Sequence, residues 1–379
     1  MVERVPDRAA AADAFRNLAD AEESRVPTYA RLCRVIADRP DLHGLLLEAP
    51  TGQRLPVLLL AAIHDVVLRY PTVALEPWYP SVSHAPPSTD DPTAALLETV
   101  ESHHDEILEL LRTRQVQTNE VNRCVAWQLA LGELCDGDRR PLALVEIGAS
   151  AGLNVRLDDY SIELRVDDGT HTAVGREDST VQLGTELRTG RWPAAERELP
   201  PVVHRVGIDA HPLDVTDPDD ARWLAACTWP EQRERFDRLT AAIGRASVDP
   251  PPLVAGDMVD GVAALVADAP DGTHVAVLAS WALTYIPRVR RAAFLDELIA
   301  VGADVRRRGG RLTLSTLDAG HALPWVDAPA IAEDADADHR HASLLAATDV
   351  TPDGVQATPL AWTQAHLAWT ERINAGRIG

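Results

Sequence analysis

The segment from Leu142 to Asn154 constrains the fold of this chain more than any other. Its sequence, LALVEIGASAGLN, places an apolar run with one acid, Glu146, before a turn that contains Gly148 and Gly152. Glycines allow a tight turn and let a ligand approach the N-terminus of the helix that would follow. The segment therefore predicts the strand, turn and helix of a nucleotide-binding α/β domain.

The spacing of this turn differs from the dinucleotide fingerprint Gly-x-Gly-x-x-Gly. That fingerprint would need glycine at Ser150 and a small residue at Leu153, and the chain has neither. The observed pattern is Glu-x-Gly-x-Ser-x-Gly. A simpler interpretation stays open, in which Gly148 and Gly152 only allow a helix to pack closely on the sheet.

After residue 140, short apolar segments alternate with amphipathic ones. Strands are expected at 142–147, 202–208, 252–255, 275–279 and 311–316, and helices at about 150–158, 219–245, 258–268 and 289–308. This alternation predicts a doubly wound, Rossmann-like and mainly parallel sheet, which binds ligands beyond the carboxyl ends of its strands. Two segments interrupt it. A hairpin insertion is expected at about 160–200, and an antiparallel hairpin at 346–350 and 356–362 should close the edge of the sheet.

The first third of the chain reads as helical. Helices are expected at 9–23, 28–37, 42–49, 93–111 and 119–134, and the segment 56–68 is apolar on all sides, which is typical of a buried helix. We therefore expect an N-terminal helical domain, or lid, over residues 1–136 and a Rossmann-like domain over residues 137–379.

Polar side chains follow three of the predicted strands. Asp209 ends the second and could accept two hydrogen bonds from ribose hydroxyls, while Asp257 ends the third and could accept from an adenine amino group. The fourth ends at Ser280 and Trp281, with Tyr285 shortly after. Each residue has a structural alternative: a helix cap or turn for the two acids, and the core for the two aromatic residues. Glu146 needs a partner if buried, either a backbone amide or a ligand amine.

Asn119 and Arg123 stand four residues apart in the predicted helix before the first strand and should share a face. They could reach a ligand carboxylate, and they could orient an acceptor molecule, as could Tyr285. The alternative is a solvated helix face capped by Thr118.

The composition limits the partners. The net charge is −22, so a nucleic acid is an unfavourable partner for this surface unless a local patch of arginine overrides the charge. The longest apolar run, 57–63, is too short to span a bilayer, and no signal peptide is recognisable, so we expect a cytoplasmic protein. The cysteines at 33, 124, 135 and 227 have no metal-ligand spacing, so we expect reduced thiols and no metal.

Several longer segments carry a resemblance to known families. They are 113–123 (TRQVQTNEVNR), 146–154 (EIGASAGLN), 207–217 (GIDAHPLDVTD) and 229–232 (WPEQ). In these segments the chain resembles the bacterial and archaeal family called domain of unknown function 2332, from about Phe15 to the tail. The turn after the first predicted strand, with the acids that follow the later strands, resembles class I S-adenosylmethionine-dependent methyltransferases. The methyltransferase resemblance implies S-adenosylmethionine as cofactor. It implies cofactor contacts from Glu146, Gly148, Ser150, Gly152, Asn154, Asp209, Asp257, Ser280 and Trp281.

The sequence thus favours a methyltransferase that acts on a small-molecule acceptor, with neither nucleic acid nor membrane as partner. Asn119, Arg123 and Tyr285 are its candidate catalytic residues. Two alternatives stay open: a non-catalytic nucleotide or metabolite sensor on the same fold, and a nicotinamide-dependent enzyme, which the glycine spacing disfavours. The acceptor and the oligomeric state are not determined by the sequence.

Overall fold

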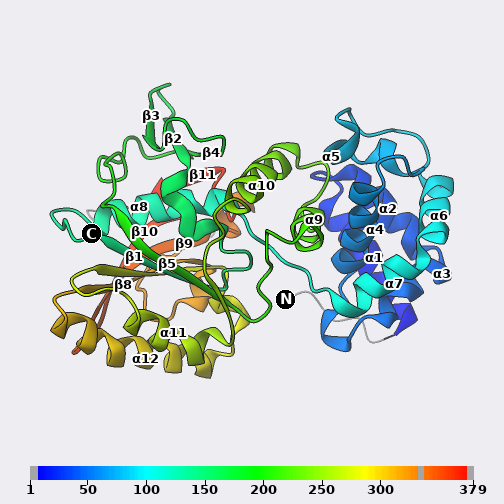
Figure 1. The fold of residues 1–379 in the computed structure, drawn as a ribbon. Coiled ribbons are helices and arrows are strands. Elements are labelled where there is room, and N and C mark those ends of the chain that lie inside the picture. The colour runs from blue at the N-terminus through cyan, green and yellow to red at the C-terminus, as the bar shows by residue number, and fades with distance from the viewer. Residues whose placement is uncertain (1–6, 332–336, 374–379) are drawn as a thin grey trace. The chain divides into compact units, whose positions relative to one another are not determined.

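A computed structural model describes residues 7–331 and 337–373 (Figure 1). Contacts within the chain divide it into two compact units. One, the helical unit, consists of residues 1–118 and 214–243. The other, the sheet unit, consists of residues 119–213 and 244–379. This grouping by contacts places residues 119–136 with the sheet and residues 214–243 with the helices. The domain boundary at residue 136 stays a prediction from the sequence.

The helical unit is built around α4 (Pro56–Arg69), which is buried over most of its length, as its apolar sequence predicts. The predicted helix at 93–111 is two helices, because the chain leaves helical geometry at His103. The predicted helix at 219–245 is likewise two helices, separated by a segment that contains Pro230. The other helices of the unit are α1 (Arg8–Glu22), α2 (Pro27–Ala37), α3 (Pro40–His43), α5 (Pro80–Ser83), α6 (Thr93–Ser102), α7 (His104–Thr113), α9 (Pro218–Ala226) and most of α10 (Arg233–Ala246).

The sheet unit contains one sheet of eleven strands, in the order β3-β2-β4-β11-β10-β9-β8-β7-β1-β5-β6. The five strands predicted from the alternating pattern are all present. They are β1 (Leu142–Ile147), β5 (Val202–Asp209), β6 (Leu253–Ala255), β7 (His274–Ser280) and β8 (Arg311–Asp318), and they pair in parallel.

The order of these five strands reverses beside β1. The chain proceeds from β1 to β5 and β6 on one side, and then crosses to β7 and β8 on the other. Such a reversal directs the loops at the carboxyl ends of β1 and β7 apart, and ligands of open α/β sheets bind at this point. The predicted doubly wound α/β fold is therefore confirmed, and it places the glycine turn after β1 at the carboxyl edge of the sheet.

The rest of the sheet comes from the insertion and the C-terminal hairpin. The predicted hairpin is β9 (Ser343–Thr351) with β10 (Gly354–Thr363), and β9 lies antiparallel to β8. The sheet continues through β11 (Trp369–Arg372) into the strands of the insertion, β4 (Gln182–Leu187), β2 (Ser161–Val166) and β3 (His171–Gly175). The predicted hairpin of the insertion is present as β2 and β3, which pair antiparallel, and β4 joins it to the main sheet.

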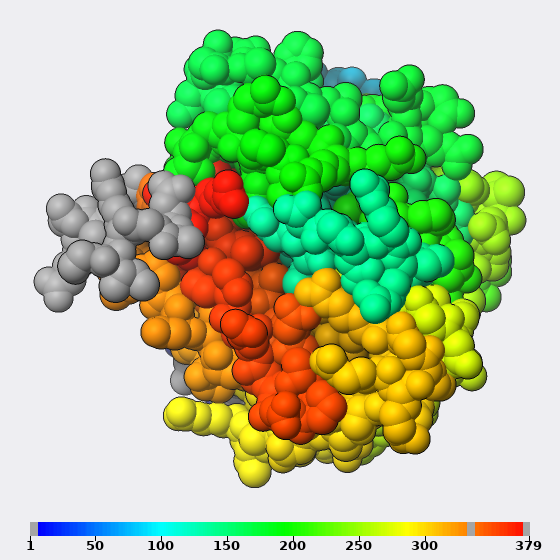
Figure 2. All heavy atoms as spheres, turned by 90° about the vertical axis from the view of Figure 1, so that its left-hand side faces the viewer, coloured from blue at the N-terminus to red at the C-terminus, as the bar shows by residue number. Residues whose placement is uncertain are grey.

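Helices cover both faces of the sheet (Figure 1). One face packs against α11 (Met258–Ala267) and α12 (Arg288–Arg307), and the other packs against α8 (Cys124–Leu134). Figure 2 shows the C-terminal strands in orange-red on one side of this unit, next to the green residues of the insertion. The strand β1 and the facing helix residues Phe294 and Leu298 are fully buried, so the glycine turn follows a rigid strand. In the described part of the chain, no helix is long and apolar enough to cross a membrane.

Candidate functional site

The turn after β1 adopts the left-handed conformation that its glycines predict. Gly148, Ser150 and Gly152 have φ values of +67°, +53° and +68°. Such values cost little for glycine but are unusual for serine, so Ser150 is held by its surroundings. The turn is followed by a 3₁₀ helix, η5 (Leu153–Asp159), and not by the predicted α-helix at 150–158. Non-helical angles at Arg156 interrupt the segment.

Both glycines of the turn also permit close packing. A Cβ atom on Gly148 would lie 2.9 Å from the Cβ of Ala282, and one on Gly152 would lie 2.8 Å from Cγ of Pro251 and 2.9 Å from Cδ2 of Leu253. The space beside Gly152 is therefore filled by protein. A larger residue at this position would disturb the packing before it could obstruct a ligand.

The backbone N–H groups of the turn all have acceptors within the protein. Gly148 and Ala149 donate to Ile208, Ser150 to Asp209, Gly152 to Ala149, and both Ala151 and Leu153 to the side-chain oxygen of Asn119. Such groups are the usual donors to a ligand anion at a turn of this kind. Here Asn119 accepts two of them, both at 3.3 Å. The turn therefore does not offer these donors to a ligand carboxylate.

Glu146, the acid of β1, is the most unusual group at this edge. Its side chain is 1% exposed, Oε1 accepts a hydrogen bond of 3.0 Å from Asn154, and Oε2 is buried without a partner. Burial raises the pKa of Glu146 to about 8, the nearby Arg123 and the bond from Asn154 lower it in part, and Asp209 raises it. Since a buried, unpaired carboxylate is costly, this group is mainly protonated at neutral pH. The ionised form would need a strong donor, such as an ammonium group, at Oε2.

Asp209 and Asp257 follow neighbouring strands, as predicted. Asp209 pairs in register with Ala255, two residues before Asp257. The Oδ2 atom of Asp209 accepts from the N–H of Ser150 at 2.8 Å, and its Oδ1 atom accepts from the N–H of His211 at 2.9 Å. This carboxylate therefore fixes the glycine turn from the adjacent strand.

Asp257 is the N-cap of α11. Its Oδ1 atom accepts from the N–H of Val259 at 2.8 Å and from Arg290 at 2.7 Å, and its side chain is 47% exposed. The structure thus gives Asp257 the capping role that the sequence left open as an alternative.

Asn119 and Arg123 are buried, with exposures of 6% and 7%, so the alternative of a solvated helix face is wrong. They do not share a helix face either. The predicted helix at 119–134 begins with a 3₁₀ turn, η4 (Val121–Arg123), which Asn119 precedes. Asn119 binds the glycine turn, whereas Arg123 donates to the carbonyl oxygens of Ser280 at 3.5 Å and Ala365 at 3.4 Å.

The residues at the end of β7 and directly after it differ in burial. Ser280 is buried, and Trp281 is half-buried with a φ of +50° and an indole N–H that donates to Ser343 at 3.2 Å. Tyr285 is 81% exposed. The structure therefore brings Ser280 close to Arg123 but leaves the side chain of Tyr285 in solvent.

One residue of this edge was not singled out from the sequence. Asp318 ends β8, is fully buried, and accepts from the backbone N–H groups of Thr284 and Ala319 at 3.1 and 2.8 Å. Burial raises its pKa, and the backbone donors and Arg123 lower it in part. The signal was present, because an acid that ends an apolar strand is the same pattern that identified Asp209.

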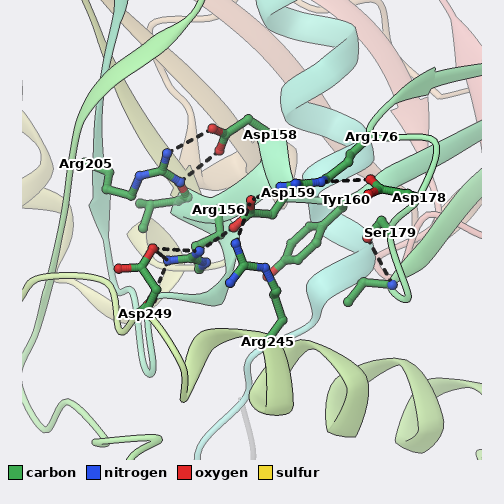
Figure 3. Close-up of polar contacts among 12 residues, drawn as sticks. Arg156, Asp158, Asp159, Tyr160, Arg176, Asp178, Ser179, Arg205, Arg245 and Asp249 are labelled. Carbon is green, nitrogen blue, oxygen red and sulfur yellow. Dashed lines mark hydrogen bonds and ion pairs between the residues drawn. The ribbon is translucent and has the colours of Figure 1, made fainter.

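An ion cluster supports η5 behind the turn (Figure 3). Arg156, which is 2% exposed, pairs with Asp159 and, at 3.1 Å, with Asp249. Asp159 also pairs with Arg176 of the insertion at 3.1 Å and with Arg245 at 3.2 Å. This cluster holds the turn, the insertion and the end of α10 together, which is a structural role.

The fold and the site define an α/β protein with a ligand-type turn at the carboxyl edge of a mixed sheet. The chain belongs to the family described as "Uncharacterized protein conserved in bacteria (DUF2332)", whose model matches residues 12–372. This finding confirms the family resemblance seen in the sequence. Comparison with curated proteins and with solved structures gave no match, so the resemblance to methyltransferases stays a hypothesis.

Proposed function

We propose that this protein is an S-adenosylmethionine-dependent methyltransferase, or a close relative, that acts on a small-molecule acceptor. The observation that carries the proposal is Glu146, whose Oε2 atom is buried without a partner at the end of β1. The amino group of the cofactor would supply the missing donor and the missing positive charge. The strand reversal beside β1 supports a ligand at this edge.

The residues fit the adenosine part of the cofactor better than its carboxylate. Asp209 would bind the ribose, because an ionised carboxyl group has about four acceptor positions and Asp209 uses two of them. Asp257, which follows the next strand, would bind the adenine. The N–H groups of the turn do not fit the cofactor's carboxylate, since all have acceptors. Arg123, whose charge lowers the pKa of Glu146, is the candidate for that carboxylate.

The bound cofactor would supply the activated methyl group. The chain would mainly align the acceptor and exclude water, so few catalytic side chains are required. Arg123 and Asn119 would act as positioning residues, Asn119 through the glycine turn. Tyr285, which is exposed, would contact an acceptor only from the entrance side.

Thermal shift measurements with S-adenosylmethionine, S-adenosylhomocysteine and NAD in parallel test this proposal. We expect the first two ligands to raise the melting temperature and NAD to leave it unchanged. Asp209→Asn should reduce the shift, whereas Asp353→Asn in the exposed turn between β9 and β10 should not. Stabilisation by NAD alone, or by none of the three ligands, would overturn the proposal.

A non-catalytic sensor on the same fold is the second candidate. It is favoured by the turn, in which Asn119 takes the donors that a ligand carboxylate would need. Binding of S-adenosylhomocysteine without methyl transfer to any acceptor in a panel of small molecules would support the sensor. Transfer to one acceptor would support the enzyme.

A further inference from the structure

A cavity of about 550 Å³ lies beyond the carboxyl ends of β7 and β8, and its volume is within the range of small-molecule sites. The sheet contributes Trp281 directly after β7, Leu344 in β9 and Trp362 in β10 to its walls. Glu146 and Asp209, which the structure describes, are not among the lining residues. The cavity is therefore distinct from the place proposed for the cofactor's amino group and ribose, although Trp281 would belong to both.

The side of the cavity formed by the loops after β7 and β8 is held in place. Trp281 has a left-handed φ of +50°, which is unusual for a bulky residue, and its indole N–H donates to Ser343 at 3.2 Å. Asp318 accepts the N–H groups of Thr284 and Ala319, so it fixes the two loops relative to each other. Strained residues that their surroundings hold in this way are typical of binding sites.

The interior of the cavity is apolar. Among the described residues that line it, those that are buried or half-buried carry no charge, and they include Trp281, Val326, Ile331, Leu344 and Trp362. The lining residues that can carry a charge are His321, Arg340 and His341. All three are exposed, which places them at the entrance and leaves the interior without a charged group.

The entrance does not favour one sign of charge. Arg340 already interacts with another group of the protein. The loop between β8 and β9, to which Arg340 belongs, also carries Asp327 and Asp338, both exposed. A charged ligand would therefore lose its hydration on entering the interior and gain no charged partner there, which is costly.

The two tryptophans border the cavity from different sides. Trp281 follows β7 and Trp362 lies near the end of β10, and the strands β8 and β9 separate β7 from β10 in the sheet. Both side chains are half-buried, so each contributes to the wall while part of it stays accessible. Aromatic rings attract one another beyond the burial of their area, which favours a flat aromatic ligand between them.

We propose that this cavity binds an uncharged, flat aromatic molecule. Its rings would contact the two tryptophans and the aliphatic interior, and a polar end of the molecule would reach the entrance. The assignment of this ligand as the methyl acceptor rests on the proposed function. The binding itself does not, because neither Glu146 nor Asp209 takes part in it.

Calorimetric titration of the full chain at pH 7.5 with 2-naphthalenemethanol, 2-naphthoate and 2-naphthylmethylamine tests the preference for an uncharged ligand, since these probes share a ring system and differ in charge. We expect the alcohol to bind at least tenfold more tightly than the carboxylate and the amine. Equal affinity of the three probes, a preference for either charged probe, or no binding of the alcohol would overturn the proposal.

Decahydronaphthalene-2-methanol tests the preference for a flat ring, because it is uncharged and similar in size but not planar. We expect it to bind at least fivefold more weakly than 2-naphthalenemethanol. Equal or tighter binding of the saturated alcohol would show that the tryptophans do not select a flat ligand, and would overturn that part of the proposal.

Variants locate the binding. Trp362→Leu should weaken the binding of 2-naphthalenemethanol at least fivefold, whereas Trp362→Phe, which keeps a flat ring, should stay within threefold of the wild type. Gly320→Leu tests the location independently. A Cβ atom on Gly320 would lie 3.6 Å from the ring of Trp362, an ordinary contact, and the backbone there is not left-handed, so the variant should fold and fill the cavity. We expect it to weaken binding at least fivefold as well.

Two arginine variants are the controls. Arg340→Gln at the entrance and Arg307→Gln on an exposed arginine of α12 should both leave the affinity for 2-naphthalenemethanol within twofold of the wild type. Melting temperatures establish which variants are folded. Unchanged binding in a folded Trp362→Leu or Gly320→Leu variant would contradict the location, and a fivefold loss in a folded Arg340→Gln variant would contradict the apolar recognition. Binding of 2-naphthalenemethanol without any binding of S-adenosylhomocysteine would overturn the enzyme proposal alone, and the reverse result would overturn the cavity proposal alone.

Discussion

Glu146 makes the stability of this protein depend on pH. Burial raises its pKa from an ordinary value of 4.5 to about 8 in the folded chain. Between these values the folded state keeps a proton that the unfolded state has lost. The contribution of Glu146 to stability is therefore complete below pH 4.5 and decreases as the pH rises toward 8.

Glu146→Gln removes this dependence, since glutamine keeps the acceptor for Asn154 and cannot ionise. We expect wild type and variant to have similar melting temperatures at pH 4.5, and the variant to be the more stable of the two at pH 8.5. Melting curves at both pH values measure this. Glu297→Gln, on an exposed residue of α12, is the control and should follow the wild type. A difference between Glu146→Gln and wild type that stays constant with pH would contradict the burial of an uncharged carboxyl group.

Asp159 has the opposite pH dependence. Burial alone would raise its pKa, but the guanidinium groups of Arg156 and Arg245 outweigh burial and hold the pKa below its ordinary value. Its contribution to stability is therefore present above the ordinary pKa of an aspartate and is lost as the pH falls through the lowered value.

Asp159→Asn should lower the free energy of unfolding by about 3 kcal/mol at pH 7, because it leaves the buried Arg156 short of a charge partner. The loss should shrink in acid. Denaturant unfolding at several pH values measures both effects. Asp178→Asn is the matched control, since Asp178 also pairs with Arg176 but is 80% exposed. Its effect should stay within about 1 kcal/mol. Equal effects of the two variants would refute the role of the buried cluster.

At the scale of elements, the segment 229–232 explains how α2 begins. The helix has no side-chain cap of its own at Val26. Instead, both carboxylate oxygens of Glu231 accept from the N–H of Thr28 at 2.9 and 3.0 Å, and one accepts from the N–H of Tyr29 at 3.1 Å. A negative charge at this end also complements the helix dipole. Glu231 is thus a cap supplied from a distant part of the sequence.

Glu231→Ala should destabilise the helical unit by about 1–2 kcal/mol, the usual cost of a lost helix cap. Glu234→Ala, which removes an exposed glutamate three residues away, is the control and should cost less than about 0.5 kcal/mol. Denaturant unfolding, followed by far-UV circular dichroism, measures both variants. Equal stability of the two would show that Glu231 does not cap α2.

Asn122, in the segment 113–123, has a comparable structural role in the sheet unit. The side chain of Asn122 donates to the carbonyl oxygens of Gly184 at 3.0 Å and His366 at 2.8 Å, and accepts from the N–H of Gly184 at 2.9 Å. It therefore joins β4 to the turn before β11. This segment carries part of the family resemblance. Its sequence, however, could not reveal that the partners of Asn122 are backbone groups far along the chain.

Helices and strands with a strong local sequence pattern could be predicted. The contacts between them could be predicted less well. The parallel strands follow from apolar runs whose backbone groups must pair with neighbouring strands. The 3₁₀ segment η5 was predicted as an α-helix, and the sequence did not show that Leu153 bonds to Asn119 and Arg156 pairs with Asp249. Asp209 was located correctly at a strand end, but its bond to Ser150 needed the register of β5 on β1.

In the molecule as a whole, the order of the residues along the chain does not show which of them belong to each of the two units. Residues 214–243 interrupt the sheet unit in sequence yet group with the N-terminal helices, and only contacts reveal such an excursion. The sequence also did not show where the insertion pairs with the sheet, because only contacts between distant residues reveal it. Two residue pairs, Trp369 with Glu186 and Thr370 with Leu187, join it to the main sheet. The sequence did predict that the strand order reverses somewhere in the sheet, because alternating strands and helices permit few topologies.

The central claim is that an adenosine cofactor with a free amino group binds beside Glu146. Calorimetric titration of the full chain with S-adenosylhomocysteine at pH 7, in buffers of different ionisation enthalpy, tests it most directly. The ligand's ammonium group should lower the pKa of Glu146, so we predict saturable 1:1 binding with release of close to one proton, and no release from Glu146→Gln. The absence of saturable binding, or binding without proton release in the wild type, would contradict the account.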